Sequence, residues 1–251
     1  MIQAVSLASN ILMECMTMAE VQMSVQSGYQ SVIVSSGSIE QHGKHLPLDT
    51  DYVLAKELAI RAAQRIGSTL VAPVIPIGYA EHHMKFPGTI SVPKDVFILY
   101  VENVAHSLIR HGFRRLLLTS FHGGNFAPSF EAAKRIRHAH PLVDVRTALD
   151  LQRLFAVTNG TIREFFPDRE ELDCHAGCVE TSMMLYLSRK YVRADQVENG
   201  AAFTEFPSFE DIQALSPNGV LGLTEGYSEK IGERLFVRII DFMIASWGLS
   251  G

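Results

Sequence analysis

Four short apolar runs alternate with helical patterns along this chain, and the alternation limits the folds that it can adopt. The first run, Ser31–Ser36, is rich in β-branched residues and flanked by small ones, which is typical of a strand buried in a parallel sheet. The later runs are Leu70–Ile77, Leu116–Thr119 and Val143–Ala148. Because strands and helices alternate through short connections, we predict an α/β fold with a mostly parallel sheet and helices on both faces.

Helical spacing of apolar residues marks the segments between these runs. Gly67 closes one helix, while Pro73 and Pro76 place the second strand at an edge or give it an irregular end. We expect a polar stretch before Cys174 and an irregular segment at 200–227. The predicted helices cover 17–27, 52–66, 94–111, 128–139, a segment entered at 174–180 that runs to about Arg189, and 231–245.

The composition narrows the class of protein. With 251 residues, 47% of them hydrophobic, and no long linker or repeat, we expect one domain, 1–251. The net charge of −5 gives no electrostatic case for nucleic acid or an anionic membrane. No apolar run approaches the ~18 residues of a membrane span, and a signal peptide is not expected. Three cysteines make no disulfide framework and favour the cytoplasm.

The loop after the first predicted strand concentrates acidic residues and histidines. Between residues 38 and 51 it contains Glu40, His42, His45, Asp49 and Asp51. Carboxylate together with imidazole suits a divalent metal such as zinc or manganese. The segments 78–90 and 120–126 also follow predicted strands, and 173–180 opens a helix. Because the carboxyl ends of parallel strands share one edge, these loops should converge there.

Two interpretations apply to the acidic residues of that loop. Glu40 and His42 point the same way on an extended segment, so each can supply a ligand to one of two neighbouring metals, or both are ordinary loop surface. Asp51 begins a predicted helix, where a carboxylate is a favoured N-cap. It can also bridge two metals about 3.5–4 Å apart, but local sequence alone favours the cap.

The later segments add further candidates. His122 stands before two glycines, and His175 and Glu180 flank a helix start where an anionic ligand or intermediate is favoured. His82 and His83 either bind metal or line a substrate pocket, whereas Cys174 and Cys178 fit small buried residues better than ligands. The chain has no nucleophile elbow, P-loop or dinucleotide fingerprint, so metal-activated water is the expected nucleophile.

Together these residues resemble the creatininase (creatinine amidohydrolase) family. The resemblance covers roughly residues 16–190. Its pieces are Met16–Val21, Gly37–Leu48 with Asp51, Phe86–Ile90, His122–Asn125 and His175–Ser182.

The resemblance implies a three-layer α/β/α fold, a centre of two divalent metals (Zn²⁺, Mn²⁺ or Fe²⁺) and, in many members, a hexamer. We therefore expect a homo-oligomer that hydrolyses a C–N bond of a small cyclic amide or formamide. The implied roles are Glu40 and His122 on one metal, His42 on the other, Asp51 bridging them, and His175 transferring a proton.

The sequence departs from the family pattern at two places that matter. The family's further carboxylate ligand, two residues after the equivalent of His122, is Gly124 here, so we expect Glu180 to take its place at the metals and in catalysis. The only tryptophan, Trp247, lies outside the expected site, which argues against creatinine as substrate.

The expected mechanism is attack of a metal-held hydroxide on the substrate carbonyl, with His175 protonating the leaving nitrogen. We assign substrate contact to His45, His83, Gly123 and Asn125. The alternatives are hydrolysis of a C–C bond in a cyclic keto-sugar or keto-inositol, and a metal-stabilised binding protein without catalysis.

Overall fold

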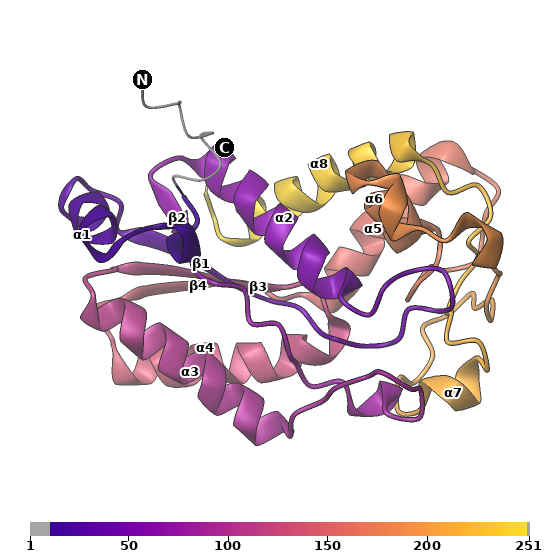
Figure 1. Ribbon diagram of the computed structural model, residues 1–251, viewed down its shortest axis with the longest axis horizontal. Coiled ribbons are helices and arrows are strands. Elements are labelled where there is room, and N and C mark those ends of the chain that lie inside the picture. Colours follow the sequence, from indigo (N-terminus) through magenta and orange to yellow (C-terminus); the bar gives the residue numbers. More distant parts are fainter. Residues whose placement is uncertain (1–10, 250–251) are drawn as a thin grey trace.

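A sheet of parallel strands forms the centre of the computed structural model, which describes residues 11–249 (Figure 1). The strand order is β2-β1-β3-β4, and every neighbouring pair is parallel. The strands are β1 Ser31–Ser36, β2 Thr69–Val71, β3 Arg115–Ser120 and β4 Asp144–Ala148. The predicted parallel sheet is confirmed, and the carboxyl ends of all four strands share one edge.

The second strand is shorter than the sequence indicated. We expected it to span 70–77, but β2 ends at Val71 and the chain returns to the sheet only at Ile75, which bridges to Ser36. Pro73 interrupts the run because proline has no N–H to donate to a neighbouring strand. The position of β2 at the edge agrees with that proline.

Helices cover both faces of the sheet and complete three layers. Helices α3 and α4 pack on one face, while α2, α5, α6 and α8 pack on the other (Figure 1). The helices are α1 Met18–Gln26, α2 Thr50–Ile66, α3 Lys94–Arg110, α4 Phe126–Ala139, α5 Leu151–Phe165, α6 Cys178–Leu187, α7 Ile212–Leu215 and α8 Glu229–Ser246. Short 3-10 helices are η2 Met13–Cys15, η3 Glu81–His83, η4 Gly123–Asn125, η5 Arg189–Tyr191 and η6 Ala194–Gln196.

The side chains of β1 show how one strand serves two cores. Ile33 packs in the core beneath α2 and α8, whereas Val32 and Val34 pack in the core beneath α3 and α4. All three are almost fully buried, at 3% exposure or less. A strand buried on both faces needs an apolar run instead of alternation, and β1 has that run.

Helix α5 lies in the stretch before Cys174, which we expected to be polar and in which we predicted no helix. Asp150 caps it by accepting a hydrogen bond from the Arg153 N–H, and its apolar side packs against α8. The central residues 158–160, Thr-Asn-Gly, have weak helix propensity and conceal the helical spacing. Tertiary packing of the amphipathic face therefore outweighs local preference in α5.

Across residues 11–249, the helices all fall short of the combination of length and apolar character that crossing a membrane requires.

We predict that Trp247→Phe destabilises the fold. Trp247 is buried, and its Nε1–H donates to the carbonyl oxygen of Leu118 in β3 at 3.2 Å. Phenylalanine keeps an apolar ring but removes that donor, so the free energy of unfolding should fall by roughly 1–3 kcal/mol in a urea titration. Val237→Ala, a change at a half-exposed position of α8, is the control and should have a much smaller effect. Equal stability of Trp247→Phe and wild type would contradict the role of this hydrogen bond.

Candidate metal centre

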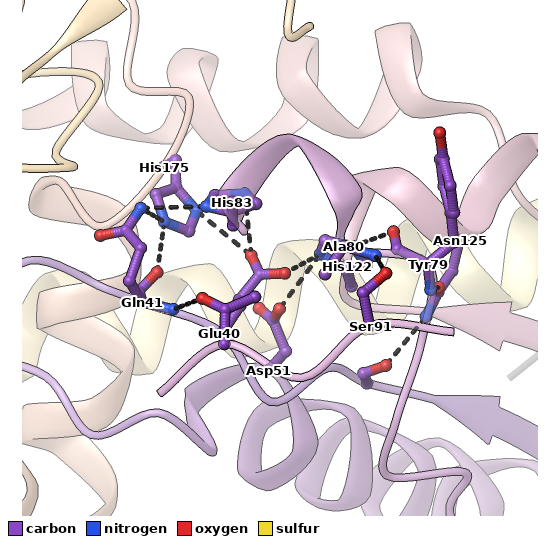
Figure 2. A network of polar contacts seen from close by, with 12 residues as sticks. Glu40, Gln41, Asp51, Tyr79, Ala80, His83, Ser91, His122, Asn125 and His175 are labelled. Carbon is purple, nitrogen blue, oxygen red and sulfur yellow. Dashed lines mark hydrogen bonds and ion pairs between the residues drawn. The ribbon is translucent and has the colours of Figure 1, made fainter. Parts of the chain in front are cut away.

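Side chains from distant segments converge beyond the carboxyl ends of β1 and β3, as the topology predicted (Figure 2). Glu40 follows β1, His122 follows β3, and His83 belongs to η3. His175 comes from the segment before α6, and Asp51 from the first turn of α2. All five are buried, at 9% exposure or less. The structure thus brings four separate loops into one cluster.

Asp51 lies between two imidazoles. Its Oδ1 is 3.3 Å from Nε2 of His42, and its Oδ2 is 3.2 Å from Nδ1 of His122. The same His122 nitrogen is 3.0 Å from Oε2 of Glu40. On the other side, Nε2 of His42 is 3.7 Å from Oε2 of Glu180. The carboxylate of Asp51 therefore turns one oxygen toward His42 and the other toward His122, and we call these two sides the His42 half and the His122 half of the cluster.

The N-cap that local sequence favoured for Asp51 is wrong. Helix α2 begins at Thr50, so Asp49 occupies the cap position and Asp51 lies inside the first turn. Within the described chain, even the side chain of Asp49 makes no capping hydrogen bond. Asp51 is 1% exposed and points at His42 and His122, so tertiary contacts determine its position.

Several polar atoms of the cluster are buried without a hydrogen bond. Among residues 11–249, both Glu40 carboxylate oxygens, Nε2 of His42 and Oδ2 of Asp51 have no partner of acceptable geometry, although they lie at ion-pair distances. A buried polar atom left unpaired is costly, and a bound cation would satisfy all of these acceptors. The groups whose donor atoms lie close enough to hold one ion are Glu40–Asp51–His122, His42–His175–Glu180 and Glu40–His83–His175.

Burial and the neighbouring charges also shift the pKa values of the groups in the cluster. Burial alone would lower the pKa of His42, but the charges of Asp51 and Glu180 outweigh it and raise that pKa to about 10. Burial raises the pKa of Glu180 to about 8 and also raises the pKa of Glu40. The buried carboxylates thus need positive charge nearby, which a divalent cation supplies.

The geometry also explains the glycine at position 124. A Cβ added to Gly124 would lie 2.2 Å from the carbonyl oxygen of Tyr79 and 2.5 Å from Nε2 of His122, so no side chain fits there. Glu180 approaches His42 instead, from the first turn of α6, and its Oε2 accepts a hydrogen bond from the N–H of Ala176. A carboxylate at the His42 half of the cluster therefore comes from α6.

A cavity of about 260 Å³ opens beside the cluster. Its lining has a polar part made of the acidic residues and imidazoles, which we call the polar wall, and an apolar part, which we call the apolar wall. Phe155 of α5 stacks against Phe206 and Phe209, with ring centroids 4.9 and 6.3 Å away. The apolar residues of the wall include Phe121, Phe126, Leu151, Leu154, Phe155, Val179, Phe209 and Ile212.

The residues to which we assigned substrate contact divide into two pairs. His83 and Gly123 line the cavity. Asn125 does not fit its assignment, because its side chain accepts from the Tyr79 N–H and donates to the Gly37 carbonyl, holding two loops together. His45 does not fit either, because it is fully buried against Oγ1 of Thr181, away from the residues that line the cavity in the described chain.

Sequence reasoning missed two contributors to the site. Gln41 lies between two expected ligands in the Gly37–Leu48 motif, and its amide contacts His83 and His175, yet we gave it no role from the sequence. Phe155 was missed because its helix was missed. Asp150 as a cap, followed by apolar residues at helical spacing, is the signal that would have indicated α5.

Known proteins resemble this chain both in sequence and in structure. The sequence model of the creatininase family, described as creatinine amidohydrolase, matches residues 14–246. The mycofactocin precursor peptide peptidase of Mycolicibacterium smegmatis (strain ATCC 700084 / mc(2)155) is 30% identical over 220 residues, covering 84% of this chain and 81% of the peptidase. The creatinine amidohydrolase of Pseudomonas putida is 29% identical over 233 residues, covering 87% and 88%. A solved structure named "Creatininase Mn" superimposes with a TM-score of 0.81 at 25% identity, covering 94% and 96%.

We predict a pH-dependent contribution of Asp173 to stability. Asp173 lies in the cavity wall, and burial raises its pKa from 3.8 to about 7. Because the folded chain holds this proton more tightly than the unfolded chain, the contribution is fully present below pH 3.8 and is lost as the pH rises through about 7. Asp173→Asn, which does not titrate, lacks this dependence.

Urea unfolding of both chelator-treated proteins between pH 4.5 and 8 measures the effect. The stability of wild type relative to the variant should fall by on the order of a few kcal/mol across that range. Two pH curves that run parallel would contradict the raised pKa.

Proposed function

This chain belongs to the creatininase family, and we propose that it is a metal-dependent hydrolase that cleaves the C–N bond of an amide with water. The observation that carries the proposal is the Asp51 carboxylate, which turns one oxygen to His42 and the other to His122. Two groups of ligands that share one bridging carboxylate are typical of a two-metal hydrolase.

We assign the ligands of two divalent cations, Zn²⁺, Mn²⁺ or Fe²⁺, to these residues. Glu40 and His122 would hold one cation, His42 and Glu180 the other, and Asp51 both. The mixed carboxylate and imidazole donors suit these metals, and the unpaired buried oxygens of the cluster support the assignment. When bound, the cations would supply Lewis acidity and lower the pKa of water.

His175 is the residue that we assign to proton transfer. It lines the cavity, and its Nδ1 lies 3.8 Å from Oε1 of Glu40, at the border between the metal cluster and the space for substrate. Burial holds the pKa of His175 well below its ordinary value, so the ring is neutral at pH 7 and has a free lone pair. Such a group can take a proton from water and deliver it to the leaving nitrogen.

The apolar wall supports an amide that has an apolar group beside the scissile bond. Phe155, Phe209 and Ile212 line the same cavity as the metal cluster, so they offer apolar contact to a substrate that is bound at the cluster. The M. smegmatis relative is named as a peptidase, which also cleaves a C–N bond. Trp247 is buried away from the cavity in the described structure, so it provides no cover for creatinine.

The apolar wall of the cavity also disfavours the two alternative functions, C–C bond hydrolysis and binding without catalysis. A keto-inositol would bring hydroxyl groups against carbon atoms that cannot pair with them, so hydrolysis of a C–C bond in such a ring is less favoured. A purely binding role would not explain a cluster that opens directly into a cavity. The cytoplasmic location and the homo-oligomer stay predictions, and the half-exposed Val96, Leu99 and Tyr100 on α3 offer an apolar surface for the homo-oligomer.

Asp51→Asn tests the metal assignment. The substitution keeps the size of the side chain but removes the charge that faces both imidazoles, so we expect loss of metal and a fall in kcat/KM of at least about 100-fold. Metal per chain is measured by mass spectrometry of the elements. Asp49→Asn, two residues away at the real cap position of α2, is the matched control and should keep both metal and activity. Full metal occupancy with unchanged activity in Asp51→Asn would refute the shared carboxylate.

Phe155→Ala tests the substrate class. Formanilide and formamide share the scissile bond but differ in the apolar group. Loss of one aromatic wall residue should lower kcat/KM for formanilide by about 10–100-fold, the equivalent of roughly 1.5–3 kcal/mol of apolar contact. Formamide turnover should change little. Phe130→Ala, at an exposed position of α4, is the control. Equal losses on both substrates would show that Phe155 serves the fold and not the substrate.

A further inference from the structure

The side chain of Gln41 is buried between two histidines of the site (Figure 2). Its Nε2 lies 3.0 Å from Nδ1 of His83, 3.0 Å from Nε2 of His175 and 3.0 Å from the carbonyl oxygen of Gly219. Its Oε1 accepts a hydrogen bond from the Gly43 N–H, also at 3.0 Å. That donor identifies which end of the amide is oxygen, so the NH₂ end faces the histidines.

The two N–H bonds of this amide meet three possible acceptors. The backbone carbonyl oxygen of Gln41 lies 2.8 Å from Nε2 of His175. Because a carbonyl oxygen only accepts, Nε2 of His175 must carry the proton and cannot accept another. The amide protons of Gln41 then go to the Gly219 carbonyl and to Nδ1 of His83. In this arrangement every polar atom around the amide is paired. If Gln41 donated to Nε2 of His175 instead, that nitrogen would carry no proton, and its lone pair would face the backbone carbonyl oxygen of Gln41.

We propose that Gln41 is a positioning residue that determines what His83 and His175 each present to Glu40. Since Nδ1 of His83 accepts from Gln41, its Nε2 carries the proton and faces Oε1 of Glu40, 3.2 Å away. His175 is turned the other way and presents a bare Nδ1 to the same oxygen at 3.8 Å. The assignment concerns which nitrogen of a neutral ring holds the proton and not the net charge of either ring.

This placement selects among the possible metal groups. Glu40, His83 and His175 lie close enough together to hold an ion, but a protonated Nε2 prevents His83 from being a ligand. His83 instead faces one oxygen of Glu40 with its N–H, and the other Glu40 oxygen lies beside His122. The bare Nδ1 of His175 is the atom that the proposed proton transfer requires.

The surroundings of Gln41 are shaped to hold the amide. Gly219 has a φ of +79°, and a Cβ there would lie 2.0 Å from Oε1 of Gln41, so glycine is needed for the close approach. The N–H of Gln41 itself is held by Oγ1 of Thr89 at 3.2 Å. Glutamate at position 41 would fill the same space but would accept where the amide donates.

Nitrogen-15 NMR of the imidazole rings in metal-free protein tests the proposal directly. We expect both His83 and His175 of wild type to carry the proton on Nε2, with His83→Asn used to assign the signals. In Gln41→Glu the proton of His83 should move to Nδ1, while His175 stays unchanged. Gln196→Glu makes the same substitution at an exposed position and should leave both rings as in wild type. A wild-type His83 protonated on Nδ1, or a Gln41→Glu spectrum identical to wild type, would overturn the proposal.

The kinetic consequence rests on the proposed hydrolase function. With metals loaded, Gln41→Glu should lower kcat by about 10–100-fold with little change in KM, as loss of an orienting partner does. Gln41→Met, which fills the space without hydrogen bonds, should give a mixture of His83 tautomers and an intermediate kcat. If wild type hydrolyses none of the amides, the proposed function fails while the NMR result still decides the role of Gln41. If wild type is active and both variants keep its tautomers, the role of Gln41 is refuted.

Discussion

Buried carboxylates facing buried imidazoles are the constraint on which the rest of the site depends. Glu40 and Asp51 are each about 1% exposed, and Glu180 adds a third acidic group to the same volume. Without positive charge, such a cluster is costly, because burial penalises each ionised group and the groups repel one another. It persists because the parallel sheet, the first turn of α2 and the start of α6 hold the groups from different directions. The fold therefore pre-forms a cation site instead of relaxing to avoid it.

Much of this arrangement could be predicted from sequence, because the sheet topology determines it. Apolar runs such as Ser31–Ser36 are unambiguous, and parallel strands must bring their following loops to one edge. The convergence of Glu40 and His122 follows from that rule alone. Asp51 shows where local rules stop: a carboxylate at a helix start is usually a cap, but here the helix begins one residue earlier and the side chain turns inward.

What the sequence could not predict depends on long-range packing. Helix α5 has a weak centre at Thr158–Gly160 and is held in place by α8, so its contribution of Phe155 to the cavity has no local signature. The role of Gln41 has no local signature either, since the partners of its Nε2 lie 42 to 178 residues away. Asn125 and His45 show a different difficulty, because a polar side chain near a site can also hold loops or helices together, as their contacts do here.

The side chains of the two walls of the cavity are held in different ways, and this difference has a consequence for function. Loops at the sheet edge form the polar wall, where each group is held by several partners and Gly124 leaves no room for change. Part of the apolar wall comes from α5 and from the segment that leads into α7, where the ring of Phe155 stacks against Phe206 and Phe209. Ring packing tolerates exchange of one apolar residue for another far better than a hydrogen-bonded cluster does. The choice of substrate can therefore change at the apolar wall while the hydrolytic chemistry at the polar wall stays the same.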